Sequence, residues 1–229
     1  MKIGAIVQAR MSSKRYPGKV LHKISGKPVL QYLLERLKRC RFLDVIVATS
    51  RDETDIPIEC FCKAHGIECY RGPLFNVAKR FKEVLNRYKF DAFVRVSGDS
   101  PLLDTRLIER GMDIFLNADY DIVTNALHRT YPTGQSVEIM RADTFCTAYE
   151  LMQGDDELEH ATRFFYKNMD KYKIFNFESG NDYSGIKLSI DTREDMNTFK
   201  DIVSNMKKPQ WEYKLKDILY THRELQEKC

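Results

Sequence analysis

The sequence predicts an α/β fold with a mainly parallel central sheet flanked by helices. Short apolar runs alternate with segments of helical periodicity through the first half of the chain, which is the pattern of repeated strand–helix–strand units. The chain has 229 residues, of which 43% are hydrophobic and 31% charged, enough to bury one sizeable core. No linker interrupts the pattern, so we expect a single domain over residues 1–229.

The first half carries four expected strands and four expected helices. Pro28 and Pro57 stand at the starts of helical patterns, and Gly66 is placed to end the second of them. The apolar runs that predict strands are 3–7, 45–48, 67–70 and 92–96. The segments with apolar residues on one helical face are 28–37, 57–66, 75–85 and 107–116.

The second half is less regular from about residue 120 to 185. We interpret about residues 125–180 as a middle insertion lobe attached to the sheet. Strands are expected there at 121–124, 136–140 and 172–177, with helices around 144–152 and 158–169. Beyond the lobe, we expect a strand at 187–190, a helix from about 194, a break at 207–209 and a last helix at 213–225.

The charge balance and the cysteines exclude several classes of protein. Lys and Arg number 37 against 33 Asp and Glu, and a net charge of +4 is too small to indicate nucleic-acid binding. No apolar run approaches membrane-spanning length and no signal peptide precedes the first strand, so we expect a cytoplasmic protein without membrane partners. No CxxC pair occurs, which favours reduced, buried thiols over disulfides or zinc. The six cysteines are Cys40, Cys60, Cys62, Cys69, Cys146 and Cys229.

The loop after the first strand, residues 8–19, is the most informative segment. It holds four cations together with two serines and a Pro-Gly pair. Arginine offers forked donors, lysine a mobile charge, and hydroxyl and backbone N–H groups fill the gaps around a polyphosphate. A solvated basic turn is the alternative, but the position after a buried strand favours an anion site. The four cations are Arg10, Lys14, Arg15 and Lys19.

The other strand ends are polar as well. In open α/β sheets ligands bind beyond the carboxyl ends of the strands, so these groups are expected to face one crevice. Neither a GxGxxG fingerprint nor a P-loop accounts for phosphate binding, since 26–28 lacks the flanking residues of the latter. The three further strand ends are Thr49-Ser50-Arg51-Asp52, Arg71-Gly72 and Ser97-Gly98-Asp99-Ser100-Pro101.

Two aspartates are candidate metal ligands. Asp99 lies in a tight turn at a strand end, and Mg²⁺ favours sites with one or two carboxylates plus substrate phosphates. Asp191 stands in the segment 189–195, where an Asp-Thr pair before a helix is equally well explained as an ordinary cap. Asp99 could likewise serve only to form its turn.

Two further segments carry hydrogen-bonding groups. Residues 125–138 could line a sugar or acid site or form a plain surface loop. Glu159-His160 lies near the start of a helix, where a histidine is more often a structural partner than a catalyst. No serine sits in a GxSxG turn, so a catalytic Ser/His/Asp set is not indicated.

Residues 6–21, with Gln8, Ala9, Arg10, Ser13, Arg15 and Lys19, resemble the signature of the sugar-acid cytidylyltransferases. Within that family they are most similar to the spore coat polysaccharide biosynthesis (SpsF-like) branch, which is related to the 3-deoxy-manno-octulosonate and acylneuraminate enzymes. The resemblance covers about residues 1–205. Further motifs that match in order are Val47-Ala48-Thr49-Ser50, Tyr70-Arg71-Gly72, 94–102, Arg129-Thr130-Tyr131-Pro132-Thr133-Gly134, Glu159-His160 and 190–195.

The resemblance implies a Rossmann-like nucleotidyltransferase fold and Mg²⁺-dependent transfer of CMP from CTP to a hydroxyl of a sugar or sugar acid, with release of pyrophosphate. It also implies a homodimer joined through the insertion lobe. The catalytic residues implied are Arg10, Lys19, Asp99 and Asp191, the two aspartates being the metal ligands. The implied nucleotide-binding residues are Gln8, Ala9, Arg10, Ser13, Arg15, Lys19, Thr49, Ser50, Arg71 and Gly98. The implied acceptor-binding residues are Arg95, Asn125, Tyr131, Gly134, Glu138, Glu159 and His160.

The sequence departs from the family pattern at three positions. Gln8 stands where the octulosonate and neuraminate enzymes usually carry proline, which supports the spore-coat branch. Thr133 and Ser136 stand where that branch commonly carries aspartate, which removes negative charge near the expected acceptor site. The acceptor is therefore left open.

Two other classes of function remain as alternatives. A metal-dependent glycosyltransferase using a nucleotide sugar could employ a similar sheet, although the dense cationic loop suits a triphosphate better. A non-catalytic nucleotide-binding subunit is the second alternative, against which the presence of both Asp99 and Asp191 argues. No clear general base appears in the sequence.

Overall fold

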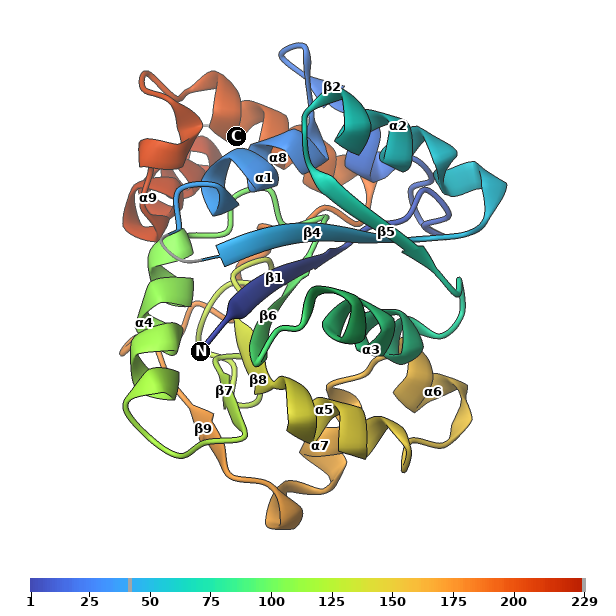
Figure 1. The fold of residues 1–229 in the computed structure, drawn as a ribbon. Coiled ribbons are helices and arrows are strands. Elements are labelled where there is room, and N and C mark those ends of the chain that lie inside the picture. Colours follow the sequence, from blue (N-terminus) through green and yellow to red (C-terminus); the bar gives the residue numbers. More distant parts are fainter. Residues whose placement is uncertain (41–42, 228–229) are drawn as a thin grey trace.

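The computed structural model describes residues 1–40 and 43–227 and contains a seven-stranded sheet (Figure 1). Helices cover both faces of the sheet, which confirms the expected α/β class. A small two-stranded ribbon of β2 (Lys23–Ile24) and β3 (Lys27–Pro28) lies outside it. The spatial order is β5 (Glu68–Gly72), β4 (Leu43–Ser50), β1 (Ile3–Gln8), β6 (Ala92–Ser97), β8 (Glu138–Arg141), β7 (Ile122–Thr124) and β9 (Ile174–Asn176).

The four strands of the first half run parallel, and the later strands make the sheet mixed. β1 pairs in parallel with both β4 and β6, so that Gln8 at its carboxyl end lies between Ala48 and Ser97. β8 is antiparallel to β6 and β7, whereas β9 is parallel to β7. The carboxyl ends of β4, β1 and β6 therefore meet at one edge of the sheet, the place where ligands bind in folds of this kind.

The helices form two layers that cover opposite faces of the sheet; in Figure 1 one layer lies at the top and left and the other at the lower right. Strand side chains alternate between the layers, so that Ile6 packs with α3 and its neighbour Val7 with the opposite layer. One layer holds α1 (Val29–Leu37), α2 (Ile56–Ala64), α4 (Thr105–Leu116), α8 (Arg193–Ser204) and α9 (Leu215–Gln226). The other holds α3 (Val77–Tyr88), α5 (Ala142–Tyr149) and α7 (Arg163–Lys167), with α6 (Gly154–Glu159) against α3.

Local signals explain where several helices begin and end. Pro28 precedes the first residue of α1, and α2 carries its proline in the first turn. The side chain of Asn76 accepts a hydrogen bond from the backbone of Lys79 and so caps α3. Short 3₁₀ segments occupy Lys19–Leu21, Glu53–Asp55, Met169–Lys171 and Gln210–Glu212.

Three local expectations are wrong. The run 187–190 forms no strand, and only Lys187 makes an isolated bridge, to Thr133, because the segment passes over loops instead of joining the sheet. Phe75 precedes α3 and is 79% exposed, so it does not belong to the buried face of that helix. The helix expected at 158–169 is divided into the end of α6 and α7, with His160 between them in a non-helical conformation.

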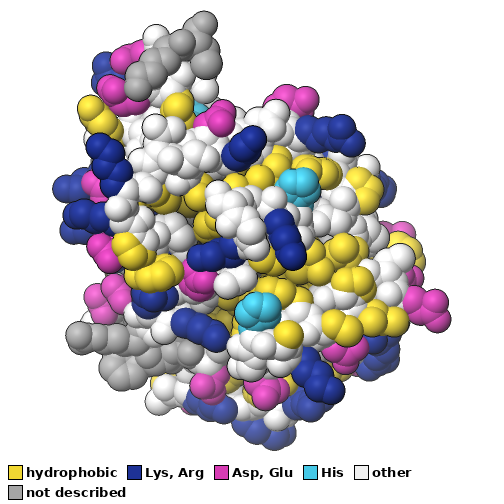
Figure 2. All heavy atoms as spheres, turned by 90° about the horizontal axis from the view of Figure 1, so that it is seen from above, with side chains coloured by type: hydrophobic (Ala, Val, Ile, Leu, Met, Phe, Trp, Pro, Cys, Tyr) yellow, Lys and Arg dark blue, Asp and Glu magenta, His cyan; other side chains and the backbone are white. Residues whose placement is uncertain are grey.

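The surface and the thiols bear on the expected class of protein. Among the described residues, no helix combines the length and the apolar character needed to cross a membrane. Figure 2 shows Lys and Arg side chains interspersed with hydrophobic, acidic and uncharged ones on the face it presents.

The five described cysteines are free, but Cys60 is exposed, so the expectation of buried thiols is wrong there. Cys229 lies outside the described residues.

Candidate functional site

A cavity of about 350 Å³ lies at the carboxyl ends of β1 and β6. It is lined by the first loop and by residues from four other parts of the chain, so the expected crevice exists at the expected edge of the sheet. The lining residues are Gln8, Ala9, Arg10, Ser13, Lys14, Arg15, Lys19, Val20, Val77, Arg80, Ser97, Asp99, Glu159, His160 and Asp191.

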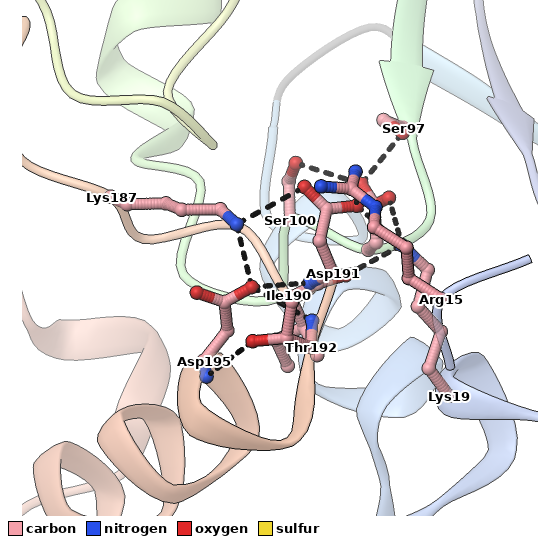
Figure 3. A network of polar contacts seen from close by, with 10 residues as sticks. Arg15, Lys19, Ser97, Ser100, Lys187, Ile190, Asp191, Thr192 and Asp195 are labelled. Atoms are coloured by element: carbon pink, nitrogen blue, oxygen red, sulfur yellow. Dashed lines mark hydrogen bonds and ion pairs between the residues drawn. The ribbon is translucent and has the colours of Figure 1, made fainter. Parts of the chain in front are cut away.

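Lys19 belongs to the network of polar contacts drawn in Figure 3. Gly18 adopts φ +75°, and this left-handed residue begins the short 3₁₀ turn that carries Lys19. The lysine is only 6% exposed, and its Nζ donates to Asp99 Oδ2 at 2.7 Å and to Asp191 Oδ1 at 3.0 Å. A third bond, to the carbonyl of Ile190, completes its three donors. The two candidate metal ligands therefore converge on one cation.

Backbone contacts bring the two aspartates together although they are far apart in sequence. The N–H of Ile190 donates to the carbonyl of Asp99 at 2.9 Å. The chain just before Ile190 is fixed in turn, because Thr133 exchanges backbone hydrogen bonds with Ile186 and Leu188. Asp99 is oriented from its own side, since Ser97 Oγ donates to its Oδ1 at 2.7 Å.

Asp191 is not the cap of the following helix. Thr192 and Asp195 form a reciprocal capping box at the start of α8, which leaves the carboxylate of Asp191 free to face the cavity. Arg15 lies 3.0 Å from Asp191 and Lys187 lies 3.3 Å from it. Burial alone would raise the pKa of Asp191, but the hydrogen bond and charge of Lys19, with the other two cations, hold that pKa below its ordinary value.

Arg10 occupies another part of the same cavity. Its guanidinium pairs with Glu159 at 2.9 Å, so that the first loop is joined to α6 across the opening. Five lining residues were not among the predicted site residues: Lys14, Val20, Val77, Arg80 and Ser97. Ser97 was named only as part of a polar strand end. Lys14 was recognised only as part of the cationic loop. Arg80 could have been noticed as a charged residue on the apolar stripe of α3.

A buried aspartate that the sequence did not single out holds the first loop to the second strand. Asp55 is fully buried and accepts from the backbone N–H of Met11 at 2.6 Å. It also accepts from the backbone N–H of Ser50 and from the Ser50 hydroxyl. The hydroxyl of Ser50 is therefore occupied within the protein, and Thr49 beside it is fully buried.

The third strand end also turns its polar groups inward. Arg71 donates to the carbonyls of Ser50 and Asp52 and pairs with Glu59, so it ties β5 to the end of β4. Of the four strand ends expected to face one crevice, those of β1 and β6 line the cavity, and those of β4 and β5 do not. Thr49, Ser50 and Arg71 thus lie behind the cavity wall.

Gly98 lies outside the lining as well, but its lack of a side chain matters. A Cβ there would lie 2.9 Å from the carbonyl oxygen of Gln8 and 3.0 Å from the Cβ of Ala9. The backbone N–H of Gly98 donates to that carbonyl at 2.8 Å. Glycine therefore allows the loop that carries Asp99 to approach the first loop closely.

Among the expected acceptor-binding residues, Glu159 and His160 line the cavity. The side-chain nitrogen of Asn125 donates to the carbonyl of Gln135, and its side-chain oxygen accepts from the N–H of Val137. Tyr131 is 4% exposed, and its hydroxyl accepts a hydrogen bond from Arg110. Gly134, with φ +95°, packs against the backbone of 188–189. These three residues hold the loop of residues 125–138 in place and do not line the cavity.

Arg95 and Glu138, the other two, form an ion pair across β6 and β8. Glu138 is 3% exposed and also accepts from the hydroxyl of Tyr166 at 2.7 Å. Burial would raise the pKa of Glu138, but the charge of Arg95 and these hydrogen bonds lower it below its ordinary value. Burial and the adjacent Glu138 carboxylate raise the pKa of Tyr166. The Arg95–Glu138 pair therefore joins β6 to β8, and the hydrogen bond from Tyr166 joins both strands to α7.

The donor set around Asp99 and Asp191 fits a magnesium ion. Two carboxylates already converge on one positive charge, and each side chain is 22% exposed toward the cavity. No cluster of three or more metal-ligating side chains occurs among the residues that the structure describes. Two carboxylates are what Mg²⁺ commonly takes from a protein when substrate phosphates supply further oxygens.

Comparisons with known proteins agree on one family. The family profile described as "Cytidylyltransferase" matches residues 4–226. The spore coat polysaccharide biosynthesis protein SpsF of Bacillus subtilis is 29% identical over 205 residues, covering 85% of this chain and 83% of that protein. The solved structure of a cytidylyltransferase from Leptospira borgpetersenii superposes with a TM-score of 0.94 at 30% identity, covering 99% of this chain and 96% of that one.

A more distant solved structure shares the fold. The CMP:2-keto-3-deoxy-manno-octonic acid synthetase complexed with CTP superposes with a TM-score of 0.68. It is 18% identical, and the alignment covers 89% of this chain and 99% of that one. The expected nucleotidyltransferase fold is thereby confirmed.

Proposed function

Because this chain belongs to the cytidylyltransferase family, we propose that it transfers CMP from CTP to a hydroxyl of a sugar or sugar acid and releases pyrophosphate. The pathway class that we propose is the synthesis of a surface polysaccharide. The name of the Bacillus subtilis relative supports that class, and the name of the octonic acid synthetase supports an acidic sugar as acceptor.

The observation that carries the proposal is the convergence of Lys19, Asp99 and Asp191 in a cavity lined by the cationic first loop. A triphosphate brings several negative charges, and the lining offers Arg10, Arg15, Lys14 and Lys19 to meet them. Two carboxylates in the same place would repel a bare triphosphate. They are explained if a divalent cation enters with the nucleotide.

In the mechanism we propose, the acceptor hydroxyl attacks the α-phosphate of CTP in line with the departing pyrophosphate. The work of the chain is to position the phosphates and to neutralise charge that grows on the leaving group. Lys19 can turn its ammonium group from the carboxylates to a phosphate oxygen, and Arg15 lies at the exposed mouth of the cavity, where it can follow the leaving pyrophosphate. Mg²⁺ held by Asp99 and Asp191 would supply further neutralisation of phosphate charge.

Glu159 and His160 are the residues that we propose to contact the acceptor, since both line the cavity and belong to the insertion lobe. Glu159 is paired with Arg10 in the free protein. In the proposed complex an acceptor hydroxyl replaces Arg10 as the partner of Glu159, and Arg10 is then available to bind phosphate.

A panel of nucleotides tests the proposal. The thermal unfolding midpoint is measured with CTP, UTP, GTP and ATP, each with and without Mg²⁺, and pyrophosphate release is then assayed with candidate sugar acids. The expected result is the largest stabilisation by CTP with Mg²⁺, because ligands that bind only the folded state raise its stability. A preference for UTP or GTP would remove the cytidylyl assignment.

The same assays separate the two alternative functions. A glycosyltransferase would be stabilised by a nucleotide diphosphate sugar and would release no pyrophosphate. A non-catalytic subunit would bind CTP and turn over none of the acceptors. Either result would contradict the proposed reaction.

A further inference from the structure

The guanidinium group of Arg80 is buried beside the cavity with unused donors. The residue is 2% exposed, and among the described residues its Nε and Nη1 have no hydrogen-bond partner. Buried charged donors are costly to leave unpaired, so a group of this kind is expected to find its partner in a bound ligand. Since Arg80 lines the cavity, the ligand is one that enters there.

An unused acceptor lies on the same side of the sheet. Gln8 ends β1, and its buried Oε1 has no hydrogen-bond partner among the described residues. Strand alternation places Gln8 on the face of Ile6, and Ile6 packs in the same apolar cluster as Val77 and Ala78 of α3. The cavity thus receives free donors from α3 and a free acceptor from β1 on one face, with the apolar side chains of Ala9 and Val77 among its walls.

Arg80 does not need a bound anion to balance its charge. The positive charge of Arg80 already has Glu159 and Asp55 near it, and their charges oppose the burial that lowers the pKa of Arg80 to about 10. Arg80 therefore remains charged at neutral pH and offers only N–H donors.

A neutral group with adjacent acceptors and one donor fits these free atoms. The pairing edge of cytosine has acceptors at O2 and N3 and a donor in its exocyclic amine. The pairing edge of uracil has an N–H at position 3, which a guanidinium cannot accept. The amide of Gln8 can turn to present either its oxygen or its nitrogen, so it would accommodate both bases. Discrimination between cytosine and uracil therefore depends on Arg80.

We propose that Arg80 selects cytosine over uracil by donating to O2 and N3 of the base, while the Gln8 side chain accepts from the exocyclic amine. The inference rests on the proposed use of a cytidine nucleotide and names the residue that makes the choice. A mismatched hydrogen-bonding edge commonly reduces binding by about 10- to 100-fold.

The test compares CTP with UTP in titration calorimetry, in the presence of Mg²⁺. The wild-type protein is expected to bind CTP about 10- to 100-fold more tightly. Arg80→Gln offers both a donor and an acceptor, so we expect it to bring the two dissociation constants to within about 3-fold. Lys79→Gln, on the exposed neighbouring position of α3, is the matched control and is expected to keep the wild-type ratio.

A measurement on the wild-type protein guards against a variant that does not fold. The triphosphate of 3-deazacytidine keeps the exocyclic amine and lacks the acceptor at position 3. It is expected to bind about 10-fold more weakly than CTP if Arg80 donates there. Binding as tight as that of CTP overturns the inference.

Further outcomes separate the possible errors. If Arg80→Gln weakens CTP and UTP equally, Arg80 holds phosphate and the base assignment is wrong. If Arg80→Gln changes neither the two affinities nor their ratio, another group makes the choice. If the wild-type protein shows no preference for CTP, the proposed function itself fails and the inference falls with it.

Discussion

At the scale of single residues, the ammonium group of Lys19 keeps two carboxylates at one point in the free protein. Asp99 has Ser97 as a further partner, whereas Asp191 has two further cations, Arg15 and Lys187. Asp191 is therefore held mainly by charge, and its ionisation is linked to the stability of the fold. Substitutions of the two aspartates are expected to show different consequences.

Asp99→Asn is expected to abolish turnover and to leave measurable nucleotide binding. The amide keeps the size and one acceptor of the carboxylate, but it lacks the charge that would hold Mg²⁺ next to the phosphates. We expect pyrophosphate release to fall at least about 100-fold, the usual loss when one charge-stabilising group is removed. Binding is checked by calorimetry. Near-normal pyrophosphate release would remove Asp99 from the mechanism.

Asp191→Asn is expected to cost stability in a way that depends on pH. Because the folded-state pKa of Asp191 is depressed, its contribution is fully present above the unfolded value of about 3.9 and is lost as the pH falls through the folded value. The difference in unfolding free energy between wild type and variant should be constant above about pH 5 and shrink below about pH 4. Urea unfolding with a chelator in the buffer measures it.

The matched control for Asp191→Asn is Asp113→Asn. Asp113 is an exposed residue of α4 with no ion pair among the described residues. Its substitution should change stability by less than about 0.5 kcal/mol at neutral pH. A difference between wild type and Asp191→Asn that stays the same from pH 7 to pH 3 would contradict the linkage.

At the scale of elements, the site depends on one irregular segment, residues 186–191, that passes between two loops. Thr133 holds it on one side through backbone hydrogen bonds, and Asp99 holds it on the other. A strand was expected at 187–190 within it, but backbone groups of this segment bond to these loops. This arrangement sets Asp191 beside Asp99. The loop around Gly134 therefore helps to position Asp191 although it does not line the cavity.

Gly134→Ala is expected to destabilise the protein and to weaken stabilisation by CTP with Mg²⁺. A Cβ at Gly134 would lie 2.6 Å from the backbone nitrogen of Ser189, and φ there is +95°. The strained backbone alone costs about 1–3 kcal/mol, and the clash pushes 188–189 away from its place. Gly180→Ala is the control, because its φ is +82° but the added Cβ meets no atom within 4 Å.

Urea unfolding and the CTP-induced shift of the thermal midpoint check this prediction. The control should lose stability through backbone strain but keep the full shift with CTP. Equal losses of both quantities in the two variants would show that the 133–134 contact does not position Asp191.

At the scale of the whole molecule, the insertion lobe contributes to the same sheet as the nucleotide half. Its strand β8 pairs with β6, and its strand β9 pairs with β7, which directly precedes the lobe. The lobe also sends α6 back across the cavity through the pair of Arg10 and Glu159. The boundaries of a lobe at about 125–180 and the single domain over 1–229 stay predictions.

The homodimer is the prediction that belongs to this scale. Light scattering coupled to gel filtration should give twice the chain mass of 26.9 kDa. Leu151 is 59% exposed within the lobe, and Leu151→Asp should favour the single chain if the lobe forms the interface. Leu116→Asp, at a 51% exposed residue outside the lobe, is the control. A single-chain mass at every concentration would exclude the dimer.

The elements that local sequence determines were predicted with boundaries close to those observed. Apolar runs and proline positions gave the strands and helices of the first half, because burial of one face and helix starts depend on neighbouring residues. The first loop was identified for a similar reason, since its cations follow a buried strand directly. The prediction that the second and third strand ends also line the cavity did not hold.

Tertiary structure decided which polar side chains face the cavity. Asp55 and nearby carbonyls take up the polar groups of Ser50 and Arg71. Thr49 is fully buried, and its hydroxyl has no hydrogen-bond partner among the described residues. Arg80 was missed because its place on the stripe of α3 resembles a core position in every respect except its charge.

The sequence by itself determined the order of the strands and helices of the first half, the cationic loop and, through its motifs, the family. Only the tertiary structure decided that Asp191 stands beside Asp99 and that Arg80 and Gln8 share one cavity. The reason is physical. Strand, helix and loop signals act between near neighbours, whereas a binding site is formed by contacts between distant segments, whose hydrogen-bond partners are chosen only when the chain is packed.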